Sequence, residues 1–261
     1  MGCDSTKDIE IEDEKNNKFS ERFKKKTELN QNGIKKEENN PLKTSDIYEI
    51  IHKESVTSTM PESNNYIDKM DIKKPFILNA VQQTQGKGTG NRKWNSSIIG
   101  NVYTTTCIPD NMIPENLKDI KVLNKIISLS IIDALNDIKP NEFFVKQPND
   151  ILCKDGCKMG GILIKPYNNF YTIGFGVNLV GKPEDDQIRE GGKKACFLAN
   201  HLDDNTKVPS ALDFSKNVSY KILDYLKLTI DEIQKKYFSH ELTGNILIGG
   251  VIKNFIKKPQ L

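Results

Sequence analysis

The sequence predicts a domain that mixes α-helices and β-strands around one core, the α+β class. Two alternating patterns support this prediction. Short runs rich in aromatic and β-branched residues, bounded by Gly, Pro or Asn, indicate strands. Apolar residues that recur every three or four positions indicate amphipathic helices. Because the two patterns alternate from about residue 47 onward, both kinds of element are expected to pack in layers.

Five runs are predicted to be strands, since each is short and ends at turn-forming residues. They cover residues 75–81, 100–108, 142–146, 161–165 and 170–180. Two longer segments are predicted to be helices. The first follows the apolar residues Ile120, Leu123, Ile127, Ile131, Leu135 and Ile138 until Pro140 stops the pattern. The second runs from Ser210 to Tyr237, where Ser210 and Asp213 could cap its start.

The chain is predicted to contain one folded domain, since 261 residues bury one good core or two small ones. Residues 1–45 carry charge runs and few large apolar residues, which indicates a disordered tail. The folded domain is expected over residues 46–240, and residues 241–261 have room for one hairpin at most. The net charge of +3 does not indicate a nucleic-acid partner. No apolar run approaches the roughly 20 residues of a transmembrane helix.

Cysteine usage favours a reducing, cytoplasmic location, since the five cysteines are unevenly spaced and no secretory signal precedes them. Cys153 and Cys157 bracket three residues, as half of a zinc site would. No second pair follows, and His52, His201 and His240 are scattered, so no zinc site is expected. The start Met1-Gly2-Cys3 fits N-myristoylation at Gly2 with palmitoylation at Cys3, which together could anchor the protein to a membrane. A chance match explains these few residues equally well.

The first motif is the loop from Gln83 to Trp94, which holds three glycines within five residues. Glycines free the backbone to bring its N–H groups against an anion, and Lys87, Arg92 and Lys93 add positive charge. The spacing is not that of a Walker A loop, because Gly-Thr-Gly and a strand follow the Gly-Lys pair. Taken alone, the loop fits a flexible hairpin better than a binding site.

Two further motifs lie at strand ends. Lys146-Gln-Pro-Asn-Asp-Ile-Leu152 carries a Pro-Asn-Asp turn signal and precedes Lys158-Met-Gly-Gly-Ile-Leu163. In Gly174-Phe-Gly-Val-Asn178, glycines interrupt a strand and Asn178 offers an amide that can donate and accept. Each motif is weak alone, but their order is informative.

In this order, the motifs resemble those of biotin protein ligases, also called holocarboxylase synthetases. The loop is similar to the family's Gly-Arg-Gly-Arg loop followed by Trp. Lys146–Leu152 resembles its Lys-Trp-Pro-Asn-Asp-Ile, Lys158–Leu163 its Lys-x-x-Gly-Ile-Leu, and Gly174–Asn178 its Gly-x-Gly-x-Asn strand. Ser58-Thr59-Met60 resembles the Ser-Thr-Asn or Ser-Thr-Met that opens the family's first helix. The resemblance spans about residues 50–200.

The resemblance implies a mixed, mostly antiparallel seven-stranded sheet flanked by helices, related to class II aminoacyl-tRNA synthetases and lipoate ligases. It implies an enzyme that forms biotinyl-5'-AMP from biotin and ATP with Mg²⁺. The biotin would then pass to a lysine in the biotin carboxyl carrier domain of a carboxylase such as acetyl-CoA carboxylase. Lipoate or octanoate ligation, and a non-catalytic descendant that only binds biotin, stay open as alternatives.

The resemblance also assigns residues to roles. Biotin would be bound by Ser58, Thr59, Gln83, Gly86, Lys87, Gly88, Thr89, Lys158, Gly160 and Gly161. ATP would be bound by Arg92, Trp94, Asn149, Asp150 and Asn178, with Mg²⁺ near Asp150. The catalytic residues would be Lys158, Lys87 and Asp150, because two anions must meet in the first step and need cations around them.

Four features depart from the family pattern. Thr89 stands where the family commonly has its second loop arginine, which predicts weaker biotin binding or leakage of the intermediate. Gln147 replaces the usual Trp, which predicts weaker nucleotide binding. No DNA-binding helix-turn-helix is recognisable before the domain, so transcriptional control is not expected. The stretch after Tyr237 is shorter than the family's C-terminal β domain.

Overall fold

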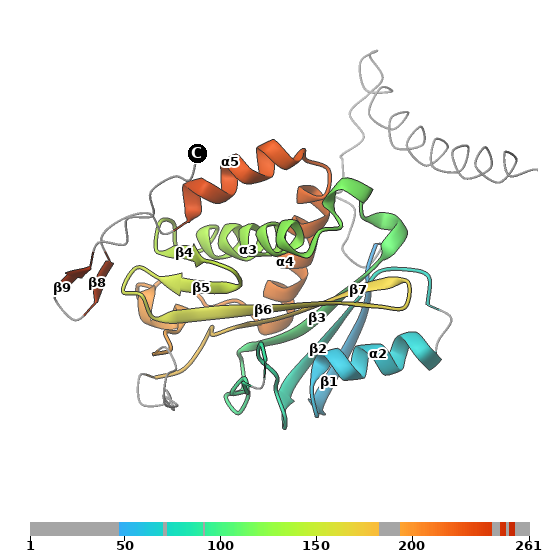
Figure 1. Ribbon diagram of the computed structural model, residues 1–261. Coiled ribbons are helices and arrows are strands. Elements are labelled where there is room, and N and C mark those ends of the chain that lie inside the picture. The colour runs from blue at the N-terminus through green and yellow to red at the C-terminus, as the bar shows by residue number, and fades with distance from the viewer. Residues whose placement is uncertain are drawn as a thin grey trace, which may run out of the picture. The chain divides into compact units, whose positions relative to one another are not determined.

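Seven strands form one mixed sheet in the computed structural model (Figure 1). In chain order they are β1 (Glu49–Val56), β2 (Phe76–Gln83), β3 (Val102–Pro109), β4 (Phe143–Lys146), β5 (Asp150–Cys153), β6 (Lys158–Tyr167) and β7 (Phe170–Val177). Across the sheet the order is β1-β2-β3-β7-β6-β5-β4. β1 and β2 run parallel and every other neighbouring pair is antiparallel. The expected mixed, mostly antiparallel seven-stranded sheet is therefore confirmed.

The structure describes residues 47–69, 72–90, 92–182, 194–241, 246–248 and 251–253. The predicted tail of residues 1–45, with the lipidation motif at Gly2 and Cys3, lies outside the described residues. Near the C-terminus, β8 (Ile246–Ile248) and β9 (Val251–Lys253) pair as a separate antiparallel hairpin.

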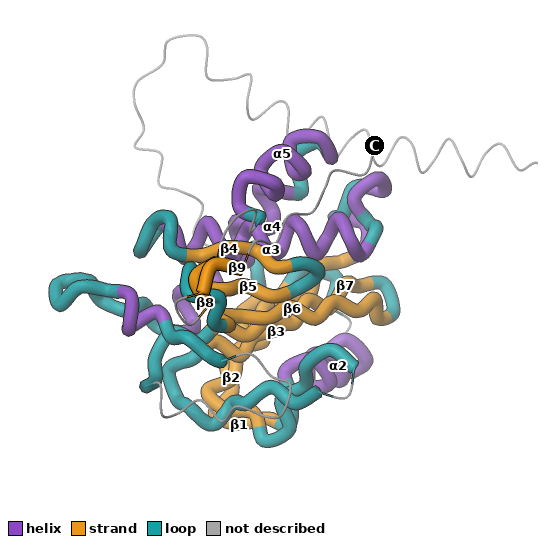
Figure 2. Tube along the Cα trace, turned by 60° about the vertical axis from the view of Figure 1, so that its left-hand side comes forward, coloured by secondary structure: helices purple, strands orange, loops and turns teal. Residues whose placement is uncertain are grey.

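Helices cover both faces of the sheet. They are α2 (Thr59–Lys69), α3 (Ile120–Asn136), α4 (Ala211–Tyr225) and α5 (Ile230–His240), with short 3-10 turns at Asp110–Met112, Glu115–Leu117 and Leu198–His201. Figures 1 and 2 show α2 on one face, whereas α3, α4 and α5 group together on the other. The start of α2 therefore lies on the face of the sheet that α3, α4 and α5 do not cover.

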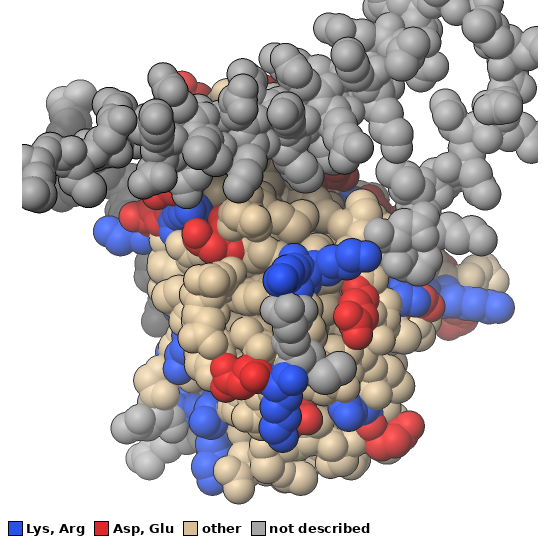
Figure 3. All heavy atoms as spheres, turned by 90° about the vertical axis from the view of Figure 1, so that its right-hand side faces the viewer, with Lys and Arg blue, Asp and Glu red and all other residues tan. Residues whose placement is uncertain are grey.

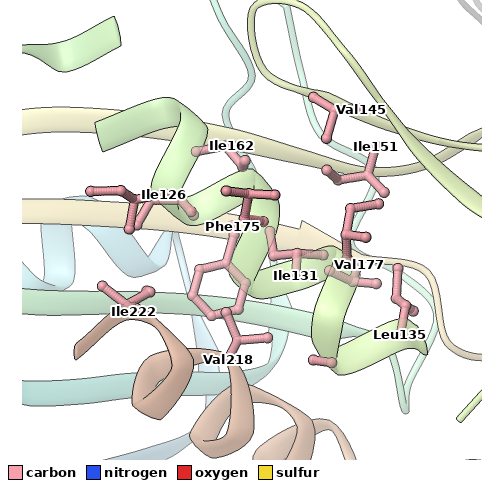
Figure 4. Close-up of a cluster of buried hydrophobic side chains, with 14 of the residues drawn as sticks. Ile126, Ile131, Leu135, Val145, Ile151, Ile162, Phe175, Val177, Val218 and Ile222 are labelled. Carbon is pink, nitrogen blue, oxygen red and sulfur yellow. The ribbon is translucent and has the colours of Figure 1, made fainter. Parts of the chain in front are cut away.

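The larger core lies between the sheet and α3, α4 and α5. Figure 4 shows Val218 and Ile222 of α4 turned toward Phe175 of β7, with Ile126 and Ile131 of α3 beside them. These side chains are at most 3% exposed. A smaller cluster of Ile51, Phe76, Leu78, Cys107 and Phe170 packs with Tyr66 and Ile67 of α2 on the opposite side. Burial of apolar surface stabilises a fold by about 25 cal/mol per Å², so both clusters stabilise the packing of the helices on the sheet.

Two strands were missed by the sequence patterns. β1 carries charged and polar residues, and only Ile51 and Val56 are buried, so apolar alternation is weak along it. It lies at the edge of the sheet, where exposed residues are tolerated. β5 has four residues and begins within the Pro-Asn-Asp turn signal, so its sequence does not stand out as a strand. Short strands are defined by their partners, here β4 and β6, more than by their own composition.

The prediction of one helix over Ser210–Tyr237 is wrong, because the segment forms the separate helices α4 and α5. Ser210 caps α4, since its Oγ accepts the Asp213 N–H at 3.1 Å. Thr229 starts a second helix through a capping box with Glu232, whose carboxylate accepts the Thr229 N–H at 2.8 Å. The apolar stripe continues through the break and therefore hid it.

The capping box gives a stability prediction. Thr229→Ala should lower the free energy of unfolding by about 1 kcal/mol, because the Glu232 N–H loses its acceptor. Urea unfolding followed by circular dichroism measures the change. Ser239→Ala near the exposed end of α5 is the matched control, and equal losses in both variants would contradict a capping role for Thr229.

Charged side chains of both signs are interspersed on the face shown in Figure 3, where the described Lys and Arg do not gather apart from Asp and Glu. This mixture agrees with the small net charge of +3. Among the described residues, none of the helices combines the length and apolar character that crossing a bilayer requires.

Candidate functional site

A cavity of about 1140 Å³ lies on the same face of the sheet as α2. Its walls come from the start of α2, the segment from Gln82 to Ile98, and strands β5, β6 and β7. A cavity of this volume is large enough for a drug-sized ligand or cofactor. The elements around it are the ones that carry the sequence motifs.

Glycines form the floor of the cavity. Gly161 of β6 lies directly opposite Gly176 of β7, so the two point to the same face. A Cβ atom on Gly176 would lie 2.5 Å from the ring of Trp94, and one on Gly161 would lie 3.2 Å from the same ring. Only glycine leaves room for the indole here. The glycines that interrupt this strand in the sequence therefore leave space for the Trp94 side chain.

The glycine-rich loop folds as a hairpin that borders the cavity. The Gly88 N–H donates to the Arg92 carbonyl at 2.8 Å, and the Trp94 N–H donates to the Gly86 carbonyl at 2.9 Å. Gly90 adopts a φ of 65°, which side chains rarely allow. The Arg92 guanidinium donates to both the carbonyl and the hydroxyl of Thr89. The segment is therefore a hairpin that also lines the cavity.

Gln83 is fixed by hydrogen bonds at one end of the cavity. Its Oε1 accepts the Thr59 N–H at 2.8 Å, and its Nε2 donates to Ser96 Oγ at 2.9 Å. The Thr59 hydroxyl also accepts from Thr105 Oγ1 at 2.9 Å. With Ser58 and Thr59 buried at the start of α2, this end is a rigid polar pocket that can match the donors and acceptors of a small ring system.

Lys158 and Asp150 form an ion pair inside the cavity, with Lys158 Nζ 2.6 Å from Asp150 Oδ1. The same ammonium lies 5.4 Å from the centre of the Trp94 ring, within the range of a cation–π contact. The two side chains are 25% and 17% exposed, so water reaches the pair only in part. The Trp94 Nε1–H is buried against Gly176 and has no hydrogen-bond partner among the described residues.

The main chain of Lys158 is held on both sides. Its N–H donates to the Lys194 carbonyl at 2.6 Å, and its carbonyl accepts from the Cys196 N–H at 3.0 Å. The Asn178 side chain donates to the same carbonyl at 3.2 Å. Asn149 is held likewise, since its Nδ2 donates to the Ile162 carbonyl at 2.8 Å. Both amides therefore stiffen the backbone around Lys158 and Asp150.

The electrostatic character of the cavity is cationic. Its basic side chains are Lys87, Arg92, Lys93, Lys146 and Lys158. Among the described lining residues, Asp150 is the single acid. Because five cations face one carboxylate across a partly shielded cavity, anionic groups such as carboxylates and phosphates are favoured there.

The cavity brings together all but one of the residues to which the resemblance assigned a binding or catalytic role. The exception is Gly160, which points to the opposite face, where an added Cβ would meet Ile151 and Val177 of the core. Gln147 also lies outside the cavity and is exposed; its side chain donates to Glu241 at 2.7 Å. Gln147 itself therefore forms no part of the cavity wall.

Sequence reasoning missed several lining residues. Ser96 orients Gln83, and Asn101 accepts the N–H groups of Leu179 and Val180 at 2.7 and 2.8 Å. Met60 packs where a Cβ on Gly174 would lie 2.8 Å from its sulfur. A serine or asparagine in a loop carries no signal of its own, so only the fold identifies these residues.

Comparison with known proteins agrees with the fold and the motifs. The profile of the biotin/lipoate A/B protein ligase family matches residues 53–178. The chain is 28% identical over 149 residues to the biotin–protein ligase of Homo sapiens, covering 53% of this chain and 20% of that protein. It is 28% identical over 117 residues to the biotin–[acetyl-CoA-carboxylase] ligase of Mycobacterium tuberculosis, covering 42% and 41% respectively.

A solved structure is also similar. The Leishmania major biotin protein ligase, crystallised with biotinyl-5-AMP, superposes with a TM-score of 0.65 at 25% identity, covering 74% of this chain and 81% of that one. The chain spans only a fifth and two fifths of the two curated relatives' lengths, so the matches concern the domain described above.

Proposed function

Because residues 53–178 match the biotin/lipoate A/B protein ligase family, we propose that the chain converts biotin and ATP to biotinyl-5'-AMP and passes the biotin to a protein lysine. The observation that carries this proposal is the cationic cavity with Lys158 at its centre, next to a rigid polar pocket. Such a cavity suits a ligand with a neutral polar ring at one end and negative charge at the other.

The polar pocket would hold the biotin ring system. Ser58, Thr59 and Gln83 are buried or hydrogen-bonded in fixed orientations, so little side-chain entropy is lost on binding. The Gly86–Gly90 hairpin borders the same space and would close over the ligand. Trp94, which lines the cavity, would then pack beside the nucleotide.

In the first step the biotin carboxylate attacks the α-phosphorus of ATP and pyrophosphate leaves, so two anions must meet. The carboxylate is ionised at neutral pH and needs no general base. Lys158 would lie between the two reacting groups, where its charge stabilises the transition state. Lys87 and Arg92 on the hairpin would add charge as it closes. Asn149 and Asn178 act as positioning residues for this strand pair.

A magnesium ion fits near Asp150, which is the one carboxylate among the described residues that line the cavity. Mg²⁺ is commonly held by one or two carboxylates together with phosphate oxygens and water. When bound, it would neutralise phosphate charge. Asp150, which accepts from Lys158 Nζ at 2.6 Å, would be the residue that holds the ion.

In the second step the neutral amine of the acceptor lysine attacks the acyl carbon of biotinyl-5'-AMP, which forms an amide and releases AMP and a proton. Asp150 would accept the proton, since it is the one carboxylate among the described residues that line the cavity. The acceptor would be the biotin carboxyl carrier domain of a biotin-dependent carboxylase, because a curated relative is named for acetyl-CoA carboxylase.

The overall reaction is tested by incubating the protein with ATP, Mg²⁺, biotin and a purified carrier domain, and probing the carrier with streptavidin. Labelling that depends on the carrier lysine would support the proposal. Lipoate and octanoate run in parallel separate the sister activity, since the family includes lipoate ligases. Biotin binding without labelling would favour a non-catalytic biotin-binding protein.

Thr89 is predicted to make the enzyme retain its intermediate poorly. It offers a hydroxyl to Arg92 and no charge of its own to a ligand. Thr89→Arg should slow the release of biotinyl-5'-AMP by about tenfold, because charge-assisted hydrogen bonds add roughly 1.5–3 kcal/mol. The release rate and the labelling of bystander proteins measure the effect. Thr89→Gln, which is polar but neutral, is the control, and equal retention in both variants would refute a charge effect.

The cellular location stays a separate proposal. A cytoplasmic enzyme with lipids at Gly2 and Cys3 would be held at a membrane without a spanning helix. Mass spectrometry of the native N-terminus tests this, since an unmodified Gly2 excludes the anchor.

A further inference from the structure

Three potential metal ligands meet behind the wall of the cavity. The sulfur atoms of Cys153 and Cys196 and a ring nitrogen of His201 all lie within 4.8 Å of one another. Cys153 is fully buried, and Cys196 is 8% exposed. None of the three lines the cavity. The proposed ligase reaction therefore leaves this cluster without a role.

Separate elements bring these residues together. Cys153 ends β5, and Cys196 follows the bridge that joins Ala195 to Lys158 of β6. His201 closes the 3-10 turn Leu198–His201. Sequence patterns do not predict this cluster, because 43 positions separate the two cysteines and no motif joins them. The expectation of no zinc site, which rested on linear spacing, is therefore reopened by the fold.

A fourth residue of the right chemistry lies beside the cluster. Cys157 stands across the turn from Cys153, whose N–H donates to the Cys157 carbonyl at 3.0 Å. The Cys196 thiol approaches that same carbonyl at 3.4 Å. Cys153 also interacts with the Cys157 side chain. Three sulfurs and one imidazole make a Cys₃His set, which is a common ligand set of structural zinc.

The surroundings favour metal binding over inert burial. The Cys196 thiol and the His201 ring both make side-chain contacts with the Cys153 sulfur, so the three ligand atoms already face one another. Glu142 Oε2 lies 3.7 Å from His201 Nδ1, and a carboxylate beside a ligand histidine orients it and raises its basicity.

We propose that Cys153, Cys157, Cys196 and His201 bind one structural zinc ion. In a tetrahedral site with zinc–sulfur bonds of about 2.3 Å, the ligand atoms lie about 3.5–3.8 Å apart. The ligand atoms of Cys153, Cys196 and His201 are already within 4.8 Å of one another, and Cys157, whose side chain contacts Cys153, would turn toward them as the fourth ligand. Binding would release the thiol protons, and no redox step is involved. Thiolate and imidazole together favour zinc over magnesium or calcium.

The ion would fasten the β5–β6 turn to the segment 194–201. That segment holds both sides of the Lys158 main chain, through the Lys194 carbonyl and the Cys196 N–H. The zinc would therefore stabilise the backbone that positions Lys158 without contacting substrate. Its four ligands are positioning residues in this account.

Elemental analysis of the full chain, purified in reducing buffer without added metal chelator, tests the proposal. One zinc per chain is expected. Replacing it with Co²⁺ should give the visible absorption of tetrahedral thiolate coordination. Chelation of the zinc should lower the melting temperature by several degrees and expose thiols to a colorimetric reagent. A chain that binds neither metal, or that isolates with a Cys153–Cys196 disulfide, would overturn the proposal.

Variants identify the ligands. Cys196→Ser should lose the zinc, whereas Cys107→Ala, which removes a buried thiol from the other core cluster, should keep it. Cys3→Ser should also keep it. Unchanged zinc content in Cys196→Ser would refute the site, and an unchanged cobalt spectrum in Cys157→Ser would refute the fourth ligand. The metal content of the wild-type chain decides the question even if a variant fails to fold. All these readouts are independent of biotin.

Discussion

Lys158→Ala is expected to reduce the rate of biotinyl-5'-AMP formation by about 10²- to 10³-fold, the range found for loss of one preorganised electrostatic group. The lysine is the cation held at the centre of the cavity, 2.6 Å from Asp150 and above the Trp94 ring. Its removal leaves the two reacting anions without the charge between them. Single-turnover formation of the adenylate, separated by chromatography, measures the rate.

Lys227→Ala is the matched control for this variant. Lys227 also pairs with an aspartate, Asp224, at 2.7 Å, but on an exposed surface outside the cavity. Its loss should leave the adenylation rate unchanged. Near-normal adenylation by Lys158→Ala would remove the lysine from the reaction and leave the cavity without its central role.

Gly176→Ala is expected to have the next largest effect. The added Cβ would lie 2.5 Å from the Trp94 ring, so the indole must move away from the sheet. Lys158 Nζ lies over the face of the Trp94 ring, and Trp94 also ends the hairpin. Both the Lys158 ammonium and the hairpin would therefore shift with the indole. Because a displacement of about 1 Å can cost 10²-fold in rate, a loss of that order is expected. The same adenylation assay measures it, with circular dichroism to verify folding.

A double-mutant cycle isolates the cause. In the Trp94→Ala background the clash is absent, so Gly176→Ala should have little further effect. Additive losses would mean that Gly176 acts through something other than the indole. The cycle therefore separates a steric seat for Trp94 from a general weakening of β7.

The regular part of the fold could be predicted from local patterns. The apolar stripe that ends before Pro140 predicted α3 to within a few residues, since one helix face meets one core. The strand runs of the buried sheet centre, β3 and β7, were likewise readable. The edge strand β1 was not, because its charged residues are stabilised by pairing with β2 and not by burial. The Thr229 break was hidden since the stripe ran through it.

The site was predictable where contacts are local and hidden where they are not. Lys158 and Asp150 lie on the two neighbouring strands of one hairpin, so their contact is expected from their short separation in the sequence. The contact between Trp94 and Gly176 joins residues 82 positions apart and appears only once the sheet is assembled. Gly160 was assigned to the cavity wrongly, because motif resemblance does not say which face of a strand a residue takes. The approach of Cys196 and His201 to Cys153 belongs to the same class of long-range contacts.

The most direct test of the central proposal is biotin-dependent exchange of labelled pyrophosphate into ATP by the wild-type chain. This exchange requires reversible formation of biotinyl-5'-AMP and needs no acceptor protein. Exchange with biotin, but not with lipoate or octanoate, is the predicted result. Absence of exchange with biotin in a folded protein that has its full metal content would contradict the assignment.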